Sequence, residues 1–411
     1  AISGMDMETD LLDDLVEKGL ARQADSQNYD VHDLVREFLT RSMEDSLSQS
    51  LHANAAEWYR VRKQNPSESI EHIHHLHMSG DTEGLAAALS EEGHALVKAG
   101  HIELLGILRV LEASMFGPRT RFVIHELTGD ILSIQGRWDD AEEQYDLALP
   151  IAARHKLTTP LARIYSSRAD LAVKKGEMDN ALSLHKKALE MQIKLRDAQG
   201  AARSYNNMGY IFRRQRDNKR AIEVYGNVEE LLDSENSPEL TEARIRLASA
   251  FLEMGEMDRA RDHAMKAHDE TAENNQDKLH ARSRAVLGRY YARIKDNDLA
   301  MHHYSGALEI LSDQSDPRSA VEVEILLGQV LSDAGSSEEA AQHYLDALSI
   351  AEANDFRMMQ GEILSRLGEV ESNRSQRMDY LQRSLVVFRE LGAVDRMREV
   401  QNAVHRVVMG H

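Results

Sequence analysis

The sequence contains no cysteine among its 411 residues. Disulfide bonds, zinc sites built from thiolates and cysteine nucleophiles are therefore excluded. It also lacks a continuous apolar run of about 18 residues, which a membrane-spanning helix needs, and its first residues lack the basic and then apolar order of a secretion signal. These absences favour a soluble protein of the reducing cytoplasm.

Proline and basic residues are both in short supply. Only 6 Pro occur, while hydrophobic residues make up 42% and charged residues 29% of a chain rich in Ala, Leu, Glu and Arg. This composition is typical of a mostly helical protein. Lys and Arg number 49 against 69 Asp and Glu, a net charge of −20 that repels nucleic acid and membrane surfaces. We therefore expect protein, peptide or small-ligand partners.

Catalytic sequence motifs are absent as well. The chain has no G-x-x-x-x-G-K-[ST] phosphate-binding loop, no G-x-S-x-G nucleophile turn and no H-E-x-x-H zinc motif. Helical repeat arrays seldom enclose the dry pockets that catalysis needs. We expect no enzyme activity from this chain.

A short pattern recurs every 39 or 40 residues along most of the sequence. A Gly or Ala opens it, and an Ala follows twelve residues later. The opening residues are Gly129, Ala169, Gly209, Ala248, Gly288, Gly328 and Gly368, and the following ones are Ala141, Ala181, Ala221, Ala260, Ala300 and Ala340. A fixed period predicts stacked hairpins of two helices, A and B, in which small residues mark the close approach of the two backbones.

Larger residues and turn residues recur in step with the small ones. Tyrosines four residues after the Ala are predicted to fill the core of each hairpin, and Gly or an Asp-Asn pair is predicted to reverse the chain between its two helices. The tyrosines are Tyr145, Tyr225, Tyr304 and Tyr344. The turn residues are Gly136, Gly176, Gly255 and Gly335, with Asp217-Asn218 and Asp296-Asn297 in two repeats.

This pattern resembles the tetratricopeptide repeat, in a 40-residue form, across residues 122–401. Six repeats fit well, and Tyr380 and Ser384 replace the small and aromatic residues of a degenerate seventh, as expected of a terminal cap. The resemblance predicts an all-α, right-handed helical-repeat superhelix. We assign residues 121–411 to this solenoid, with about seven repeats.

Residues 46–120 are predicted to be helical but out of step with the repeat, and we expect helical hairpins that bridge to the solenoid. Four histidines, His72, His74, His75 and His77, lie in one of these helices. Some of them share a helix face, which is compatible with a metal site. No carboxylate stands at a recognised ligand spacing beside them, so we predict no metal site.

The first 45 residues follow a different pattern from the repeats. A helix over 10–20, a hairpin over 21–31 and a second helix over 32–43 follow the order of a winged helix that is truncated at its start. The chain begins with Ala1 rather than Met, so we expect a fragment. The helix over 10–20 is acidic, which argues against binding to DNA phosphates.

The tripeptide Val31-His32-Asp33 is similar to the Met-His-Asp signature of STAND signalling ATPases, the class of NB-ARC and MalT-like regulators. The resemblance implies that His32 contacts the phosphate of bound ADP. It also implies an upstream nucleotide-binding domain in the native chain, with ADP or ATP as its cofactor. We expect no cofactor in this fragment.

Charges along the A helices suggest a binding surface. From the third to the sixth repeat, acidic and basic residues alternate at matching positions, which predicts ion pairs between neighbouring helices. The second and third repeats break this alternation, and Asn206 and Asn207 resemble the backbone clamp of peptide-binding repeats. We predict an anion-binding spot formed by Arg163, Lys174, Arg203, Asn206, Asn207, Arg213 and Arg214. The alternative is that these cations are simply solvated, or that they pair with Asp170 and with glutamates of the B helices.

Two functions are compatible with these patterns. The first is the regulatory arm of a STAND-type ATPase, which recognises an acidic peptide, a protein or a small ligand on the concave repeat face and relays binding to the nucleotide-binding domain. The second is a stand-alone tetratricopeptide scaffold for protein–protein interaction. Whether the native gene encodes a nucleotide-binding domain upstream distinguishes the two.

Overall fold

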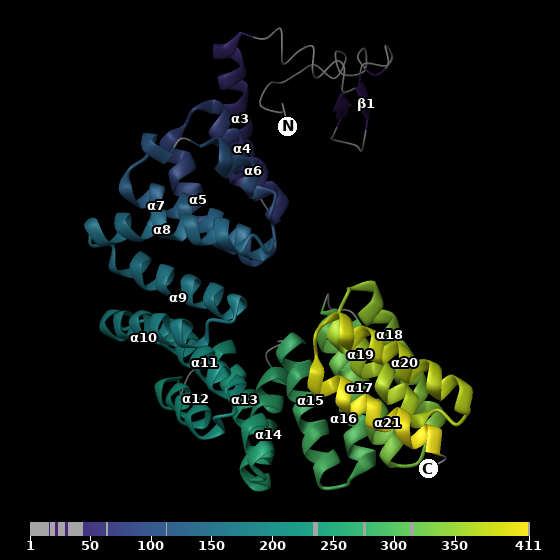
Figure 1. The fold of residues 1–411 in the computed structure, drawn as a ribbon. Coiled ribbons are helices and arrows are strands. Elements are labelled where there is room, and N and C mark those ends of the chain that lie inside the picture. The colour runs from purple at the N-terminus through teal and green to yellow at the C-terminus, as the bar shows by residue number, and fades with distance from the viewer. Residues whose placement is uncertain are drawn as a thin grey trace. The chain divides into compact units, whose positions relative to one another are not determined.

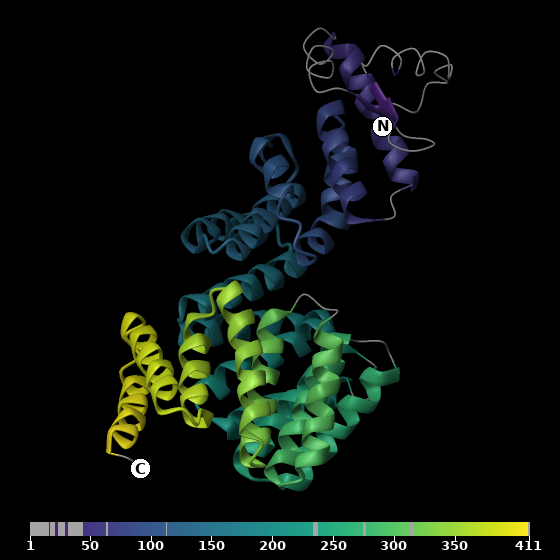
Figure 2. The ribbon, with the colours of Figure 1, turned by 90° about the vertical axis from the view of Figure 1, so that its right-hand side faces the viewer.

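The computed structural model describes residues 16, 21–23, 29–31, 44–62, 65–111, 113–232, 237–273, 277–312 and 316–409. Within these residues the chain is almost entirely helical, which confirms the predicted all-α repeat fold (Figures 1 and 2). No helix in this part of the chain is long and apolar enough to cross a membrane.

A short hairpin lies near the N-terminus. Strand β1 (Ala21–Gln23) pairs antiparallel with β2 (Tyr29–Val31), so that Ala21 stands opposite Val31. This pairing confirms the predicted hairpin. His32 and nearly all of the two helices predicted on either side of it lie outside the described residues, so the winged helix remains a prediction.

The chain divides into two compact units, Ala1–Leu195 and Arg196–His411, called here the N-terminal and C-terminal units. The helices of the N-terminal unit are α3 (Asp45–Arg62), α4 (Pro66–Ser79), α5 (Thr82–Lys98), α6 (Leu104–Val110), the short 3₁₀ helix η1 (Ala113–Met115), α7 (Pro118–Ile134), α8 (Trp138–Arg154), α9 (Thr158–Lys175) and α10 (Met178–Leu195). In this unit α7 with α8 and α9 with α10 form the first two repeats.

The C-terminal unit continues the alternation of A and B helices. Its helices are α11 (Ala198–Arg214), α12 (Asn218–Leu232), α13 (Pro238–Met254), α14 (Met257–Glu273), α15 (Asp277–Arg293), α16 (Asn297–Ser312), α17 (Pro317–Asp333), α18 (Ser337–Ala353), α19 (Arg357–Val370), α20 (Arg374–Glu390) and α21 (Val394–Met409). Each A helix packs along the B helix that follows it. The third to seventh repeats lie here, followed by α21.

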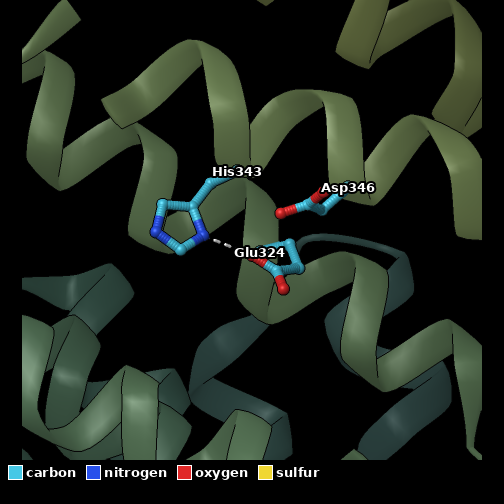
Figure 3. A group of neighbouring side chains, drawn as sticks. All are labelled: Glu324, His343 and Asp346. Carbon is cyan, nitrogen blue, oxygen red and sulfur yellow. Dashed lines mark hydrogen bonds and ion pairs between the residues drawn. The ribbon is translucent and has the colours of Figure 1, made fainter. Parts of the chain in front are cut away.

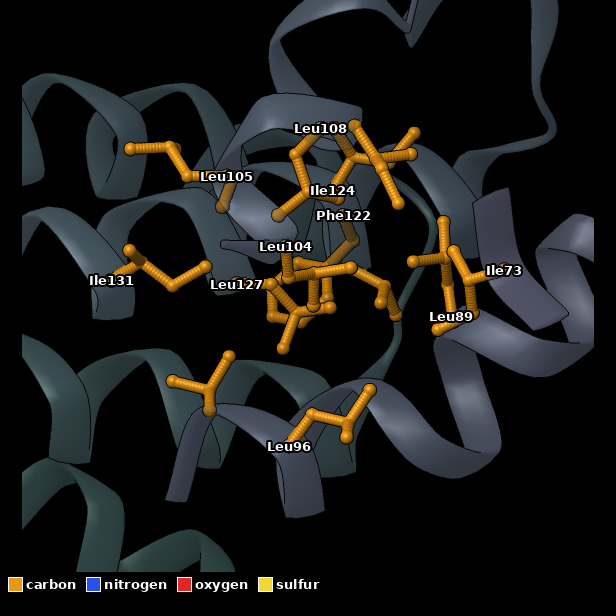
Figure 4. Packing of buried hydrophobic residues seen from close by; sticks show 14 of the residues in the cluster. Ile73, Leu89, Leu96, Leu104, Leu105, Leu108, Phe122, Ile124, Leu127 and Ile131 are labelled. Atoms are coloured by element: carbon orange, nitrogen blue, oxygen red, sulfur yellow. The ribbon is translucent and has the colours of Figure 1, made fainter. Parts of the chain in front are cut away.

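Apolar side chains from α4 to α7 form the core of the N-terminal unit ahead of the repeats (Figure 4). Ile73, Leu89, Leu104, Phe122 and Leu127 are all fully buried in it. Burying an aliphatic or aromatic side chain of this size stabilises a fold by about 1.5–3 kcal/mol. The bridging helices are thereby joined to the first repeat by one continuous core.

In four of the repeats, the small residue that opens the pattern touches a tyrosine. The glycine of the A helix lies against the tyrosine ring of its B helix, in the pairs Gly129–Tyr145, Gly209–Tyr225, Gly288–Tyr304 and Gly328–Tyr344. All four tyrosines are at most 1% exposed. A methyl group at Gly209 would lie 2.3 Å from the Tyr225 ring, a distance that atoms cannot adopt. This contact explains why the position requires glycine.

The second and fourth repeats use a different combination at the same two positions. There the A helix carries Ala169 or Ala248, and the B helix carries His185 or Ala264 in place of tyrosine, all buried. The larger A-helix residue therefore coincides with a smaller B-helix residue. In the seventh repeat the hydroxyl of Ser384 donates to the carbonyl oxygen of Gly361 at 2.7 Å, consistent with its predicted degenerate character.

The turns inside the repeats follow the prediction in part. Gly136, Gly176, Gly255 and Gly335 have φ values of 76°, 83°, 79° and 88°, so each occupies the left-handed region as predicted. Where an Asp-Asn pair was predicted to reverse the chain, the residue before the pair does so: Arg216 and Lys295 have φ values of 61° and 63°. Asp217 instead accepts from the backbone N–H of Arg220 at the start of α12.

The glycine–tyrosine contact predicts an unusual response to substitution. Gly209→Ala should lower the free energy of unfolding by about 1–2 kcal/mol, because overpacking against Tyr225 outweighs the usual gain in helix propensity. Gly226→Ala is the matched control, since nothing lies within 4 Å of its added methyl group. That substitution should be neutral or stabilising by up to about 1 kcal/mol. Urea unfolding of both variants checks this, and equal effects would contradict the packing argument.

Candidate partner-binding surface

The A helices form the inner layer of the repeats. Within the C-terminal unit α11 contacts α13, α13 contacts α15 and α15 contacts α17, whereas successive B helices approach one another less closely. The row of A helices is therefore the inner side of the stack. Two predicted site residues lie on α9 of the N-terminal unit, and the other five lie on α11 of the C-terminal unit.

On α9, Arg163 is held by a buried glutamate of α7. Its Nε and Nη2 atoms donate to the Glu126 carboxylate at 3.0 and 2.7 Å. Glu126 is only 1% exposed, and its Oε2 also lies 2.8 Å from the Nε2 atom of His94. Two parallel hydrogen bonds between a guanidinium and a carboxylate are among the stronger polar contacts in proteins. Arg163 therefore neutralises a charge that the fold has buried.

Lys174 lies in the last turn of α9 and reaches the end of α7. Its Nζ atom donates to the Ser133 hydroxyl at 2.8 Å and to the Ser133 carbonyl oxygen at 3.2 Å. Ser133 belongs to the last turn of α7, where carbonyl oxygens lack partners within the helix. A cation at this end of a helix is favourable. Lys174 thus completes the C-terminal end of α7.

On α11, Arg203 and Asn206 both contact Glu239 at the start of α13. The Arg203 Nη1 atom lies 3.0 Å from the Glu239 carboxylate, and the Asn206 Nδ2 atom donates to the Glu239 carbonyl oxygen at 2.9 Å. Asn206 is 4% exposed, and its Oδ1 atom is buried without a hydrogen bond. The amide predicted to clamp a peptide backbone thus binds the backbone of the next A helix. Its neighbour Asn207 is partly exposed.

The two arginines at the end of α11 differ. Arg213 forms an ion pair with Glu253 of α13, which also accepts from the Asn218 side chain at 3.1 Å. Arg214 is exposed, and its guanidinium lies 6.0 Å from the centre of the Tyr210 ring. Among the described residues Arg214 has no carboxylate partner. It is the member of the predicted set whose charge is available to a ligand.

Tyr210 is a member of this surface that the sequence pattern did not reveal. The ring is 37% exposed on α11. Besides Arg214, the guanidinium of Arg246 on α13 lies 5.5 Å from its centre. Arg246 is itself paired with Glu242, which lies one turn earlier on the same helix. We call Tyr210, Arg214 and Arg246 the Tyr210 platform. The feature that marks this group is an aromatic residue exposed on an A helix.

Of the ion pairs predicted between equal positions of successive A helices, the described residues form one, and elsewhere the partners differ. Arg282 donates to Glu242 through Nη2 at 3.0 Å, as predicted. Glu253, however, is held by Arg213 rather than by Arg214. Packed helices cross at an angle, so residues at equal repeat positions do not stand at equal heights.

The carboxylates that pair with Arg163, Arg203 and Arg213 come from A helices, whereas the alternative considered above placed them on B helices.

The histidines of the bridging segment do not converge on one point. His72 is buried, with Nδ1 3.6 Å from Glu92. His75 lies with its Nδ1 atom 2.7 Å from that of His52 on α3, and its ring stacks on Tyr59. Burial, together with the neighbouring His52, lowers the pKa of His75 to about 4, and burial also lowers the pKa of His52. The pair is therefore neutral near pH 7.

A second carboxylate accompanies Glu126 on the inner side of α7. Asp130 lies one turn further along the helix and accepts a hydrogen bond from the Tyr145 hydroxyl at 2.7 Å. The pKa of Asp130 is raised to about 6, because burial and the charge of Glu126 outweigh the opposing effect of the Tyr145 hydrogen bond. The first repeat thus places two acidic groups on its A helix, where sequence reasoning singled out only the cations of the second.

Sequence comparison finds a repeat family in one part of the chain. The tetratricopeptide repeat family model matches residues 160–234, from within α9 to just beyond α12. No curated protein matches the sequence.

Solved structures share the fold at low identity. The STAND protein with a tetratricopeptide repeat sensor from Pyrococcus horikoshii is similar over 95% of this chain, with 15% identity and a TM-score of 0.65, and this chain spans 60% of its length. The quorum sensor NprR from B. thuringiensis, in its apo form, is similar over 80% of this chain and 94% of its own, with 15% identity and a TM-score of 0.57.

A third structure of this type contains a peptide. The Rap conjugation gene regulator of the plasmid pLS20, solved in complex with a Phr peptide, is similar over 75% of this chain and 94% of its own, with 14% identity and a TM-score of 0.51. At these identities the similarity establishes the fold. The chain is a helical repeat protein of the tetratricopeptide type.

The raised pKa of Asp130 predicts a pH-dependent effect of substitution. An aspartate in the unfolded chain titrates near pH 4, so the folded protein holds this proton to higher pH. The folded protein is therefore destabilised as the pH rises from about 4 to about 6, where the buried Asp130 carboxyl must ionise. Asp130→Asn, which keeps an acceptor for Tyr145, should raise the free energy of unfolding by about 1–2 kcal/mol at pH 7.5 and little at pH 4. Urea unfolding at both pH values tests this, and an equal shift at both would contradict it.

Proposed function

We propose that the chain is the partner-binding arm of a STAND-type signalling ATPase and that it recognises an acidic peptide segment on the inner face of its A helices. The observation that carries the binding half of this proposal is the Tyr210 platform. It combines an exposed aromatic ring with an arginine that no carboxylate of the described residues neutralises.

The chemistry of the platform suits a carboxylate ligand. The guanidinium of Arg214 presents several N–H donors in one plane, which match the two oxygens of a carboxylate. Tyr210 adds apolar contact area with little loss of side-chain freedom. The net charge of −20 opposes an acidic ligand at long range, but salt at about 0.1 M screens charges beyond about 10 Å, so local contacts decide.

The regulatory half of the proposal rests on two supports. The Val31-His32-Asp33 tripeptide is similar to the STAND signature, and the fold is shared with a STAND protein that has a tetratricopeptide sensor. A ligand can shift a regulatory equilibrium only through different affinities for its two states. Binding on the A helices would act in this way if it favoured one arrangement of the arm relative to the nucleotide-binding domain.

Substitution of Arg214 tests the binding surface. In fluorescence polarisation with a labelled library of eight-residue peptides rich in Asp and Glu, the wild-type chain should retain a subset of peptides. Arg214→Glu should weaken the best of them by about tenfold or more, because a charged hydrogen bond is replaced by repulsion. Lys219→Glu makes the same change of charge on the exposed start of α12 and should leave the affinity within about twofold.

Arg214 is a cleaner choice than Arg203 for this test, because substitution of Arg203 would also break its ion pair with Glu239. Undiminished peptide affinity in Arg214→Glu, or equal losses in both variants, would contradict a binding site at the Tyr210 platform.

The regulatory half is tested on the protein encoded by the complete native gene. If a nucleotide-binding domain is part of that protein, ADP should co-purify with it and be released on denaturation, and His32→Ala should abolish its retention. Chromatography of the released nucleotide gives the measurement. A native protein that carries no nucleotide would contradict the STAND assignment and favour a scaffold, whatever the outcome of the peptide experiment.

A further inference from the structure

Three side chains between α17 and α18 bring their ligand atoms together. Glu324 projects from α17, and His343 and Asp346 project from α18 toward it (Figure 3). One ligand atom from each residue lies within 4.8 Å of the other two, and no other group of three such residues occurs in the described part of the chain. His343 and Asp346 are three residues apart and so share a helix face.

The cluster joins two carboxylates to one imidazole, and no Lys or Arg of the described residues belongs to it. The Glu324 side chain is only 14% exposed and the His343 ring 30% exposed, with Nδ1 of His343 2.7 Å from Oε2 of Glu324. Asp346 is exposed and accepts from the Gln342 amide at 3.1 Å. Among the described residues neither carboxylate forms an ion pair with Lys or Arg. The Glu324 carboxylate pairs instead with the His343 ring, and this hydrogen bond raises the pKa of His343.

The two preceding repeats show what the scaffold holds at the same place. The residues at the positions of Glu324, His343 and Asp346 are Arg244, His263 and Lys266 in the fourth repeat and Arg284, His303 and Gly306 in the fifth. The A helix therefore supplies an arginine in both. The Arg284 guanidinium fills the space beside Gly306, where an added methyl group would lie 1.9 Å from its Nη2 atom.

The sixth repeat thus keeps the histidine but replaces a guanidinium with carboxylate oxygens. In the fourth repeat, Arg244 forms an ion pair with a carboxylate, and its Nε atom lies 3.1 Å from Glu229. Two neighbouring repeats place a positive charge beside this histidine, and the sixth supplies three converging donor groups and no such cation. The place that the arginine guanidinium takes in the other two repeats is open to solvent beside Asp346.

We propose that Glu324, His343 and Asp346 form a binding site for a divalent transition-metal cation, with zinc as the ion that best fits the ligands. One imidazole nitrogen and two carboxylate oxygens are ordinary zinc ligands, and three protein ligands leave a position for water or a further ligand. Bonds of about 2.1 Å place tetrahedral ligands about 3.4 Å apart. Small side-chain rotations bring the three groups to that spacing, and the cation supplies the charge that arginine supplies in the neighbouring repeats.

Zinc binding to the chain after removal of metals with EDTA tests the proposal. Competition with a chromogenic zinc chelator should reveal one site in the wild type that is lost or weakened by about tenfold or more in His343→Ala and in Asp346→Asn. Asp346 is exposed, so its conservative substitution leaves the fold intact. Glu338→Gln, an equal change of charge at the exposed start of α18, and His303→Ala, the equivalent histidine of the fifth repeat, should retain the site.

A second readout separates this site from other histidines that take up zinc, such as the His52 and His75 pair. Excess zinc should raise the melting temperature of the wild type and of the two control variants more than that of His343→Ala and Asp346→Asn, because only a site present in the folded state stabilises it. Equal zinc affinity, stoichiometry and thermal shift in all five proteins would overturn the proposal.

Discussion

The contact between the two helices of each repeat governs the rest of this structure. Where the B helix contributes a tyrosine, the A helix must contribute glycine, because the ring lies against its backbone. In the second and fourth repeats a smaller B-helix residue accompanies alanine on the A helix. Close packing thus limits the size of one residue according to the size of the other. Repetition of this contact sets the spacing of the helices, and that spacing positions every charged side chain on the A helices.

The A helices carry a network of buried and half-buried charges. Glu126 holds Arg163, Glu239 holds Arg203, and Glu253 holds Arg213, so most cations of the inner face serve the fold. An ion pair of this kind fixes how one A helix sits against the next, since breaking it leaves a charge without a partner. What distinguishes the Tyr210 platform is that Arg214 stands outside this network. The binding site that we propose therefore lies where the structural pairing stops.

The same scaffold also allows single repeats to specialise. Helix positions that carry Arg244 in the fourth repeat and Arg284 in the fifth carry Glu324 in the sixth, while the facing histidine remains. Such exchanges alter the polar contacts between the A and B helices, while the small residues of the repeat pattern stay in place. In an array where each repeat packs only on its neighbours, a local change of this kind has little effect elsewhere. A repeat protein can therefore acquire separate sites along its length.

The sequence by itself determined the fold, because the period of 39 or 40 residues and the small and aromatic positions follow directly from helix packing that is local to each repeat. It also predicted the hairpin at 21–31, the left-handed glycines and the pair between Glu242 and Arg282. Only the tertiary structure decided which carboxylate each arginine reaches, since crossing angles shift partners by a turn, as with Arg203 and Glu239. The contact of Arg246 with Tyr210 and the grouping of Glu324 with His343 likewise depend on distances across helices, which no spacing along one helix encodes.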